Sequence, residues 1–158
     1  MNPMNKALLP SRIPGGAYIL HLKTERDLML RTGSLGNIAL PSGHYVYIGS
    51  ARKSISGRVN RHKRLAETKR GKRHWHIDYM LAHPEVKLIR GDAYAGYREC
   101  DIAKQIETMK GVSTPVLRFG SSDCRSGCKA HLFRMGGSLR NKIPSIVIRK
   151  EKRKNSKT

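Results

Sequence analysis

The stretch GHYVYIGSARKSISGRVNRHKR, residues 43–64, decides how the rest of the sequence is interpreted. Its first part is aromatic and β-branched, the composition of a strand that packs on a core. After Gly49-Ser50 a basic residue stands at nearly every second position. Ser54 is a suitable N-cap for a helix that runs to about Leu65. The stretch therefore predicts a core strand followed closely by a basic helix.

Strands are also predicted upstream. AYILHLK, residues 17–23, follows a double glycine and alternates between two faces. Residues 27–50 predict three further strands, with the first pair joined at 33–36 as a hairpin and the second pair separated at 41–43. Such short connections favour antiparallel neighbours.

Downstream, strands and helices mix. Trp75 to about Ala82 and Glu99–Lys110 have helical spacing, and the second of these has an apolar stripe. EVKLIRG (85–91) predicts a strand, residues 112–136 are mostly loop, and residues 144–149 predict a last short strand. This order predicts an α/β or α+β domain, a small mixed β-sheet flanked by helices. We expect a flexible arm over 1–14, one domain over 15–149, and a basic disordered tail over 150–158.

The composition is strongly basic. Lysine and arginine number 32 against 11 acidic residues, a net charge of +21, and the last ten residues contribute only six basic and one acidic. Such a charge predicts a polyanionic partner, nucleic acid before a membrane surface. No apolar run approaches the roughly 18 residues of a membrane span. Three cysteines and no recognisable secretory signal favour a cytoplasmic protein with reduced thiols.

Five residues suggest chemistry. Tyr18 follows the double glycine, and Tyr47 precedes a glycine that permits close approach of a ligand. Arg58 and His62 are four apart and therefore share one helix face. Glu99 lies in the first turn of its helix, in line with the buried stripe, so its carboxylate should point inward or into a cleft.

At these positions the sequence resembles the GIY-YIG nuclease superfamily. The two name motifs occur as Gly16-Ala17-Tyr18 and Tyr47-Ile48-Gly49, with alanine in place of the first isoleucine. Arg58 and His62 match the R-x-x-x-H helix, and Glu99 stands where the family places a metal-binding glutamate. The blocks HWHIDYML (74–81) and FGSSDCRSGCKAHLF (119–133) are similar to an uncharacterised branch, labelled a domain of unknown function. The motifs are further apart than in typical members, which predicts a β-hairpin inserted at 27–40 between two strands that still pair.

The resemblance implies a metal-dependent endonuclease that hydrolyses phosphodiester bonds in nucleic acid. Glu99 would bind one Mg²⁺ or Mn²⁺, and Tyr18 would be the general base for water. Tyr47 would position Tyr18 or donate to the phosphate, and Arg58 would clamp the phosphate. His62 would share in proton transfer or orient Tyr47.

Each residue also has a purely structural alternative. A strand tyrosine is most often packing, an arginine in a basic stretch is an ordinary phosphate contact, and a first-turn glutamate favours the helix dipole. His62 aligns with Ile55 and Val59, as a core-edge histidine would. Only the joint pattern favours the site. The rival function is a non-catalytic DNA- or RNA-binding module of the same fold, and a third is an RNA-associated structural protein.

Nucleic acid is the expected partner, DNA favoured over RNA. The expected contacts are the basic residues around the helix after the core strand: Arg52, Lys53, Arg61, Lys63, Arg64, Lys69, Arg70, Lys72 and Arg73.

The cysteines leave a second question open. Cys124, Cys128 and His131 form C-x₃-C-x₂-H, which would need a fourth ligand such as His74 or His76 to bind zinc. This spacing is not a standard zinc pattern, so buried packing is favoured over zinc. Cys100 is expected to pack in the core. Trp75 is expected in the core as well, with stacking on nucleic acid as the alternative.

Overall fold

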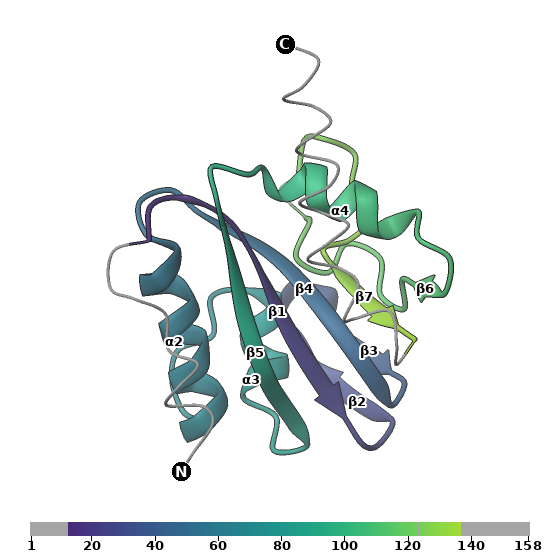
Figure 1. Cartoon of the computed structure of the whole chain (residues 1–158). Helices are drawn as coiled ribbons and strands as arrows, with labels where there is room; N and C mark the ends of the chain where they lie inside the picture. The colour runs from purple at the N-terminus through teal and green to yellow at the C-terminus, as the bar shows by residue number, and fades with distance from the viewer. Residues whose placement is uncertain (1–12, 123, 137–158) are drawn as a thin grey trace.

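A computed structural model describes residues 13–122 and 124–136 (Figure 1). The larger sheet has five strands in the order β5-β1-β4-β7-β6, and a second sheet pairs β2 with β3. The elements are β1 (Gly16–Thr24), β2 (Leu28–Arg31), the 3₁₀ turn η1 (Gly33–Leu35), β3 (Asn37–Leu40), β4 (Gly43–Ala51), α2 (Ile55–Thr68), α3 (His76–Leu81), β5 (Val86–Ala95), α4 (Glu99–Glu107), β6 (Val112–Ser113) and β7 (Leu132–Met135).

Alternate residues of β1 and β4 point to opposite sides of the larger sheet, so apolar side chains lie on both of its faces. Both faces are covered by other elements. On one side, Tyr18 and Leu20 share a core with α2, α3 and the β2–β3 hairpin. On the other side, Ile19 and Ile48 share a smaller core with α4. The hairpin and the first two helices thus lie on one side of the sheet and α4 on the other (Figure 1).

The predicted α+β class is confirmed, and so is the inserted hairpin. Residues 28–40 form their own two-stranded sheet, while β1 and β4 pair in continuous register from Gly16↔Ala51 to Thr24↔Gly43. The helix after the core strand is also confirmed, since the Ser54 side chain accepts a hydrogen bond from the Gly57 N–H and α2 continues to Thr68.

Three details differ from the sequence prediction. Among the described strands every pair is antiparallel, rather than mixed. β3 does not pair with β4, because β1 and β7 occupy the two edges of β4. β7 lies in a segment expected to be mostly loop; four residues are too few for alternation to show.

Parts of the sequence prediction lie outside the described residues, namely most of the arm, the strand at 144–149 and the tail at 150–158. Within 13–122 and 124–136, no helix has the length and apolar character needed to cross a membrane.

The pairing of β1 with β4 brings Tyr18 directly opposite Gly49. A Cβ atom on Gly49 would overlap Cζ and Oη of Tyr18 and would lie 2.8 Å from its Cε2. The tyrosine ring therefore occupies the space that any larger residue at position 49 would need. The glycine of the second motif is required for packing, because only its missing side chain lets the ring lie against the strand.

We predict that Gly49→Ala lowers the free energy of unfolding by about 1–3 kcal/mol, the usual effect of overpacking a core. Gly57→Ala is the matched control, because its added Cβ finds no atom closer than 3.4 Å at an exposed helix position. That control should raise stability by up to about 1 kcal/mol through helix propensity. Urea unfolding of both variants checks the prediction, and an unchanged midpoint for Gly49→Ala would contradict it.

Candidate functional site

Tyr18 of β1 and His62 of α2 form a buried side-chain pair. The Tyr18 hydroxyl lies 2.8 Å from Nε2 of His62, and the His62 side chain is fully buried. Burial lowers the pKa of His62 to about 4 against the opposing charge of Asp78, so its imidazole is neutral near pH 7. Burial also raises the pKa of Tyr18 well above its usual value, so its hydroxyl stays protonated. That hydroxyl donates to Nε2 when the proton of the neutral imidazole is on Nδ1.

Asp78 supports this pair, although it is not among the residues predicted from the sequence. Its fully buried carboxylate accepts hydrogen bonds from the backbone N–H groups of His74 (2.7 Å) and Trp75 (3.1 Å). Both of its oxygens are bound by Arg61, at 3.1 and 3.2 Å. Oδ1 lies 3.8 Å from Nδ1 of His62, an electrostatic contact that favours the tautomer with its proton on Nδ1.

A clue to Asp78 was present in the sequence. It stands three residues after Trp75, at the third position of α3, where a carboxylate commonly accepts from the N–H groups that begin a helix.

Trp75 lies at the surface, so the prediction of a core tryptophan was wrong. Its side chain is 37% exposed. The guanidinium carbons of Arg58 and Arg61 lie 4.6 and 5.0 Å from its ring centroid, and cation–π attraction holds the ring over α2. Arg58 also donates from Nη1 to the Ser50 carbonyl at 2.6 Å, which fixes the guanidinium beside the end of β4.

Tyr47 is buried next to Tyr18. Their ring centroids are 6.4 Å apart, and Phe119 meets Tyr47 edge-on at the same centroid distance. Burial raises the pKa of Tyr47, and the negative charge of Glu99 raises it further. The hydrogen bond of His62 goes to Tyr18 and not to Tyr47, so of its two predicted roles the geometry favours proton transfer over orienting Tyr47.

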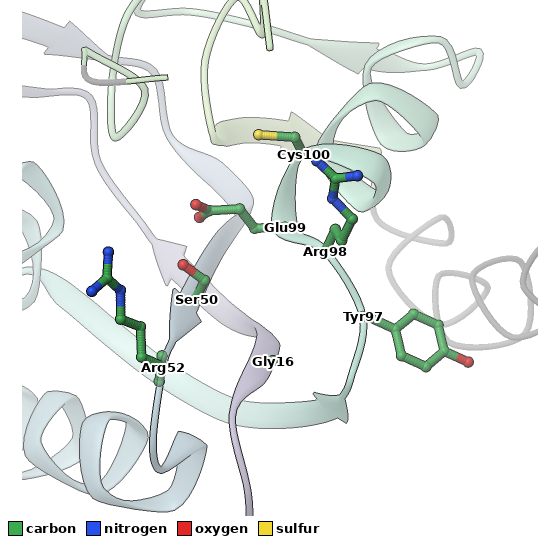
Figure 2. A pocket seen from close by; sticks show the side chains of 8 residues that line it. Gly16, Ser50, Arg52, Tyr97, Arg98, Glu99 and Cys100 are labelled. Carbon is green, nitrogen blue, oxygen red and sulfur yellow. The ribbon is translucent and has the colours of Figure 1, made fainter. Parts of the chain in front are cut away.

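Glu99 lines an open cavity of about 290 Å³. Its carboxylate reaches into this space together with Ser50 and the Arg52 side chain, whereas Tyr97 points away (Figure 2). After burial and the charge of Tyr47, the negative charge of Glu99 also raises the pKa of Tyr18. A carboxylate that is 31% exposed beside an open cavity fits a hard divalent cation such as Mg²⁺ or Mn²⁺, which keeps part of its water shell.

The structure therefore brings the five predicted residues into one neighbourhood. The charges of Arg58 and Glu99 both act on the pKa of Tyr18 and of Tyr47, and His62 is hydrogen-bonded to Tyr18. The two tyrosines and His62 are buried beneath, while Arg58 and Glu99 are partly exposed.

Of the nine cations predicted to contact nucleic acid, three are buried or engaged within the protein and six are exposed. Lys63 is buried and its Nζ finds no hydrogen-bond partner within the described residues, so it is no surface contact. Nζ of Lys69 donates to the carbonyls of Leu81 and Val86, and Arg61 is engaged by Asp78. The exposed members are Arg52, Lys53, Arg64, Arg70, Lys72 and Arg73.

The cysteines also differ from the sequence prediction. Cys100 is only partly buried, and its sulfur gathers with Cys124, Cys128 and His131, whose ligand atoms all lie within 4.8 Å of one another. His76 does not join this group, because its Nδ1 accepts a hydrogen bond from the Gly120 N–H at 2.9 Å. The fourth member of the cluster is thus a cysteine 24 residues upstream of Cys124, a partner that local spacing could not show.

Comparison with known proteins gives one match. A family model described as a domain of unknown function, DUF123, matches residues 17–152, which include all five site residues and the cysteine cluster. Searches of curated proteins and of solved structures found no match. The sequence-based expectation of a family labelled only as a domain of unknown function is confirmed. The chain belongs to the DUF123 family.

Proposed function

We propose that this protein is a GIY-YIG-type, metal-dependent endonuclease that hydrolyses phosphodiester bonds in nucleic acid, DNA favoured over RNA. The observation that carries this proposal is the hydrogen bond between Tyr18 and His62, set beside Tyr47, Arg58 and Glu99. Any buried tyrosine hydroxyl needs a hydrogen-bond partner, but here the partner is a neutral imidazole that can accept the proton, and a carboxylate and a guanidinium lie at the partly exposed side of the same site.

The pair is suited to proton transfer. When the Tyr18 hydroxyl gives its proton to Nε2 of His62, the Tyr18 oxygen can take a proton from an attacking water. The resulting imidazolium is stabilised by Asp78, whose oxygen lies 3.8 Å from Nδ1. The raised pKa of Tyr18 and the lowered pKa of His62 both oppose this transfer in the free protein. The positive charge of Arg58 lowers the pKa of both groups, so it favours the tyrosinate and disfavours the imidazolium.

Binding of the scissile phosphate falls to the partly exposed groups. The Arg58 guanidinium has five N–H donors, more than its bond to Ser50 requires, and it is held in place by the Trp75 ring. Glu99 would hold the divalent cation, whose chemistry when bound is stabilisation of the negative charge that develops on the phosphate.

The exposed cations would hold the nucleic-acid backbone. A second hollow, of about 330 Å³, lies beside α2 and is lined by basic side chains and His74. The basic residues of this hollow are Arg61, Arg64, Arg70 and Lys72. Positive charge at α2 and the loop after it would give the protein a sequence-independent grip on phosphates.

A second function, binding without cleavage, is favoured by one specific observation. The hydroxyls of Tyr18 and Tyr47 belong to buried side chains, and burial raises the pKa of both. A protein of this fold that only binds nucleic acid would keep the basic surface and leave Tyr18 protonated.

We predict that Glu99→Gln lowers metal-dependent cleavage at least about 10²-fold, because a bound cation contributes several kcal/mol to charge stabilisation. The measurement uses labelled branched, flapped, single-stranded and duplex DNA and RNA with Mg²⁺ or Mn²⁺. Glu85→Gln, an exposed glutamate outside the cavity, is the control and should cleave like wild type.

Cleavage that disappears in Glu99→Gln while binding persists would establish the nuclease and its substrate class. Tight binding of every substrate without cleavage by the wild-type protein would refute the nuclease and favour the binding module.

The basic surface can be tested by salt dependence. We predict that Arg70→Ala combined with Lys72→Ala weakens DNA binding and reduces the slope of log affinity against log salt by about 1.8, since each lost phosphate contact removes about 0.9. Lys104→Ala with Lys110→Ala removes the same charge from exposed positions at and just beyond α4 and should change the slope little. Equal slopes for the two double variants would contradict a binding surface at α2.

A further inference from the structure

The segment between β6 and β7 must be held in place by contacts other than the hydrogen bonds of helices and strands. Residues 114–131 form neither helix nor strand among the described positions, yet Phe119 and Ala130 within them are fully buried. Loops of this length without regular structure are uncommon in compact domains and usually need another source of order. Cys124, Cys128 and His131 lie within or at the end of this loop, and Cys100 lies in the first turn of α4.

The four side chains are arranged as a metal site would require. The Cys100 sulfur lies 3.4 Å from that of Cys124 and 3.9 Å from Nε2 of His131, and all four ligand atoms fall within 4.8 Å of one another. Tetrahedral zinc, with Zn–S bonds of about 2.3 Å, places its sulfurs about 3.8 Å apart. The Cys100–Cys124 and Cys100–His131 distances are close to the edges of such a tetrahedron, and none of the other distances exceeds 4.8 Å.

A disulfide does not account for the cluster. The three cysteines are free thiols, and 3.4 Å between the sulfurs of Cys100 and Cys124 is far longer than the roughly 2.05 Å of an S–S bond. A disulfide would also leave one cysteine and His131 without a role. The Ser126 N–H donates to the Cys124 sulfur at 3.4 Å, and metal-binding thiolates are commonly supported by hydrogen bonds from groups outside the ligand set.

His131 is oriented as a metal-binding histidine would be. Its Nε2 faces Cys100, while its Nδ1 lies 3.6 Å from Oε2 of Glu99. A metal-binding histidine almost always directs its other ring nitrogen at a carboxylate or carbonyl. The backbone of His131 is fixed as well, since its carbonyl accepts from Ile48 and its N–H donates to Phe119, both at 2.8 Å.

We propose that Cys100, Cys124, Cys128 and His131 bind one structural zinc ion. Three thiolates and one imidazole select a soft, tetrahedral cation over Mg²⁺ or Ca²⁺, and four protein ligands leave no open position for a reaction. The ion would join the start of α4 to the loop before β7, next to Glu99. The zinc site does not depend on the proposed nuclease activity.

The first test is metal content. Wild-type protein without a polyhistidine tag, purified under reducing conditions, should contain about one zinc per chain by plasma mass spectrometry. Cys128→Ser should lower zinc affinity by more than the roughly 10–100-fold that a lost supporting hydrogen bond costs. His74→Asn is the control, because this exposed histidine is not in the cluster and its loss should leave zinc content unchanged. Glu99→Gln, which changes only the carboxylate facing His131, should lower zinc affinity by no more than about 10–100-fold.

A second measurement tests the zinc site with wild-type protein, in case Cys128→Ser fails to fold. Wild-type protein treated with a chelator and titrated with Co²⁺ should develop the thiolate-to-cobalt charge-transfer band and the visible bands of tetrahedral cobalt. The chelated protein should melt at a lower temperature, and Zn²⁺ should restore the melt. Wild-type protein that contains no zinc and gives no thiolate band with Co²⁺ would overturn the proposal, as would an intact mass that shows a disulfide under the same reducing conditions.

Discussion

The candidate site depends on one close contact, the Tyr18 ring lying against the backbone of Gly49. Pairing of β1 with β4 sets these residues opposite each other, and the absent side chain leaves room for the ring. With the ring so placed, its hydroxyl reaches Nε2 of His62 on α2. A displaced ring would leave two buried polar groups without a partner, which is costly inside a protein. The same contact between Tyr18 and Gly49 therefore determines both how β1 packs on β4 and where the Tyr18 hydroxyl meets His62.

The electrostatics around this contact keep His62 neutral near pH 7. Burial disfavours its charged form, and the nearby Asp78 carboxylate is largely compensated by Arg61 and two backbone N–H groups. The same carboxylate remains close enough to stabilise an imidazolium once it forms. Such an arrangement suits a transient proton acceptor better than a permanent charge, and it lies beneath a surface where Arg58 and Glu99 are partly exposed.

Much of the fold and part of the candidate site could be predicted from the sequence. Alternation located β1 and a capping serine located the start of α2, while the resemblance of the motifs to a known family grouped Tyr18 with His62. The buried position of Lys63 was also available, because it stands four residues after Val59 on the apolar face of α2. Local patterns could not predict contacts between distant segments. Asp78 acts on a helix before it in the chain, the arginines that hold Trp75 belong to another element, and Cys100 meets two cysteines within a long loop.

Single-turnover cleavage by Tyr18→Phe would test the central claim most directly. This substitution removes only the hydroxyl and keeps the ring against Gly49. Tyr45→Phe is the matched control, since Tyr45 lies in the same core but directs its hydroxyl to the Pro41 carbonyl. We expect Tyr18→Phe to cleave at least about 10²-fold more slowly at unchanged affinity, the usual contribution of a general base, and Tyr45→Phe to cleave like wild type. Equal cleavage rates for the two variants would contradict a catalytic role for the Tyr18–His62 pair.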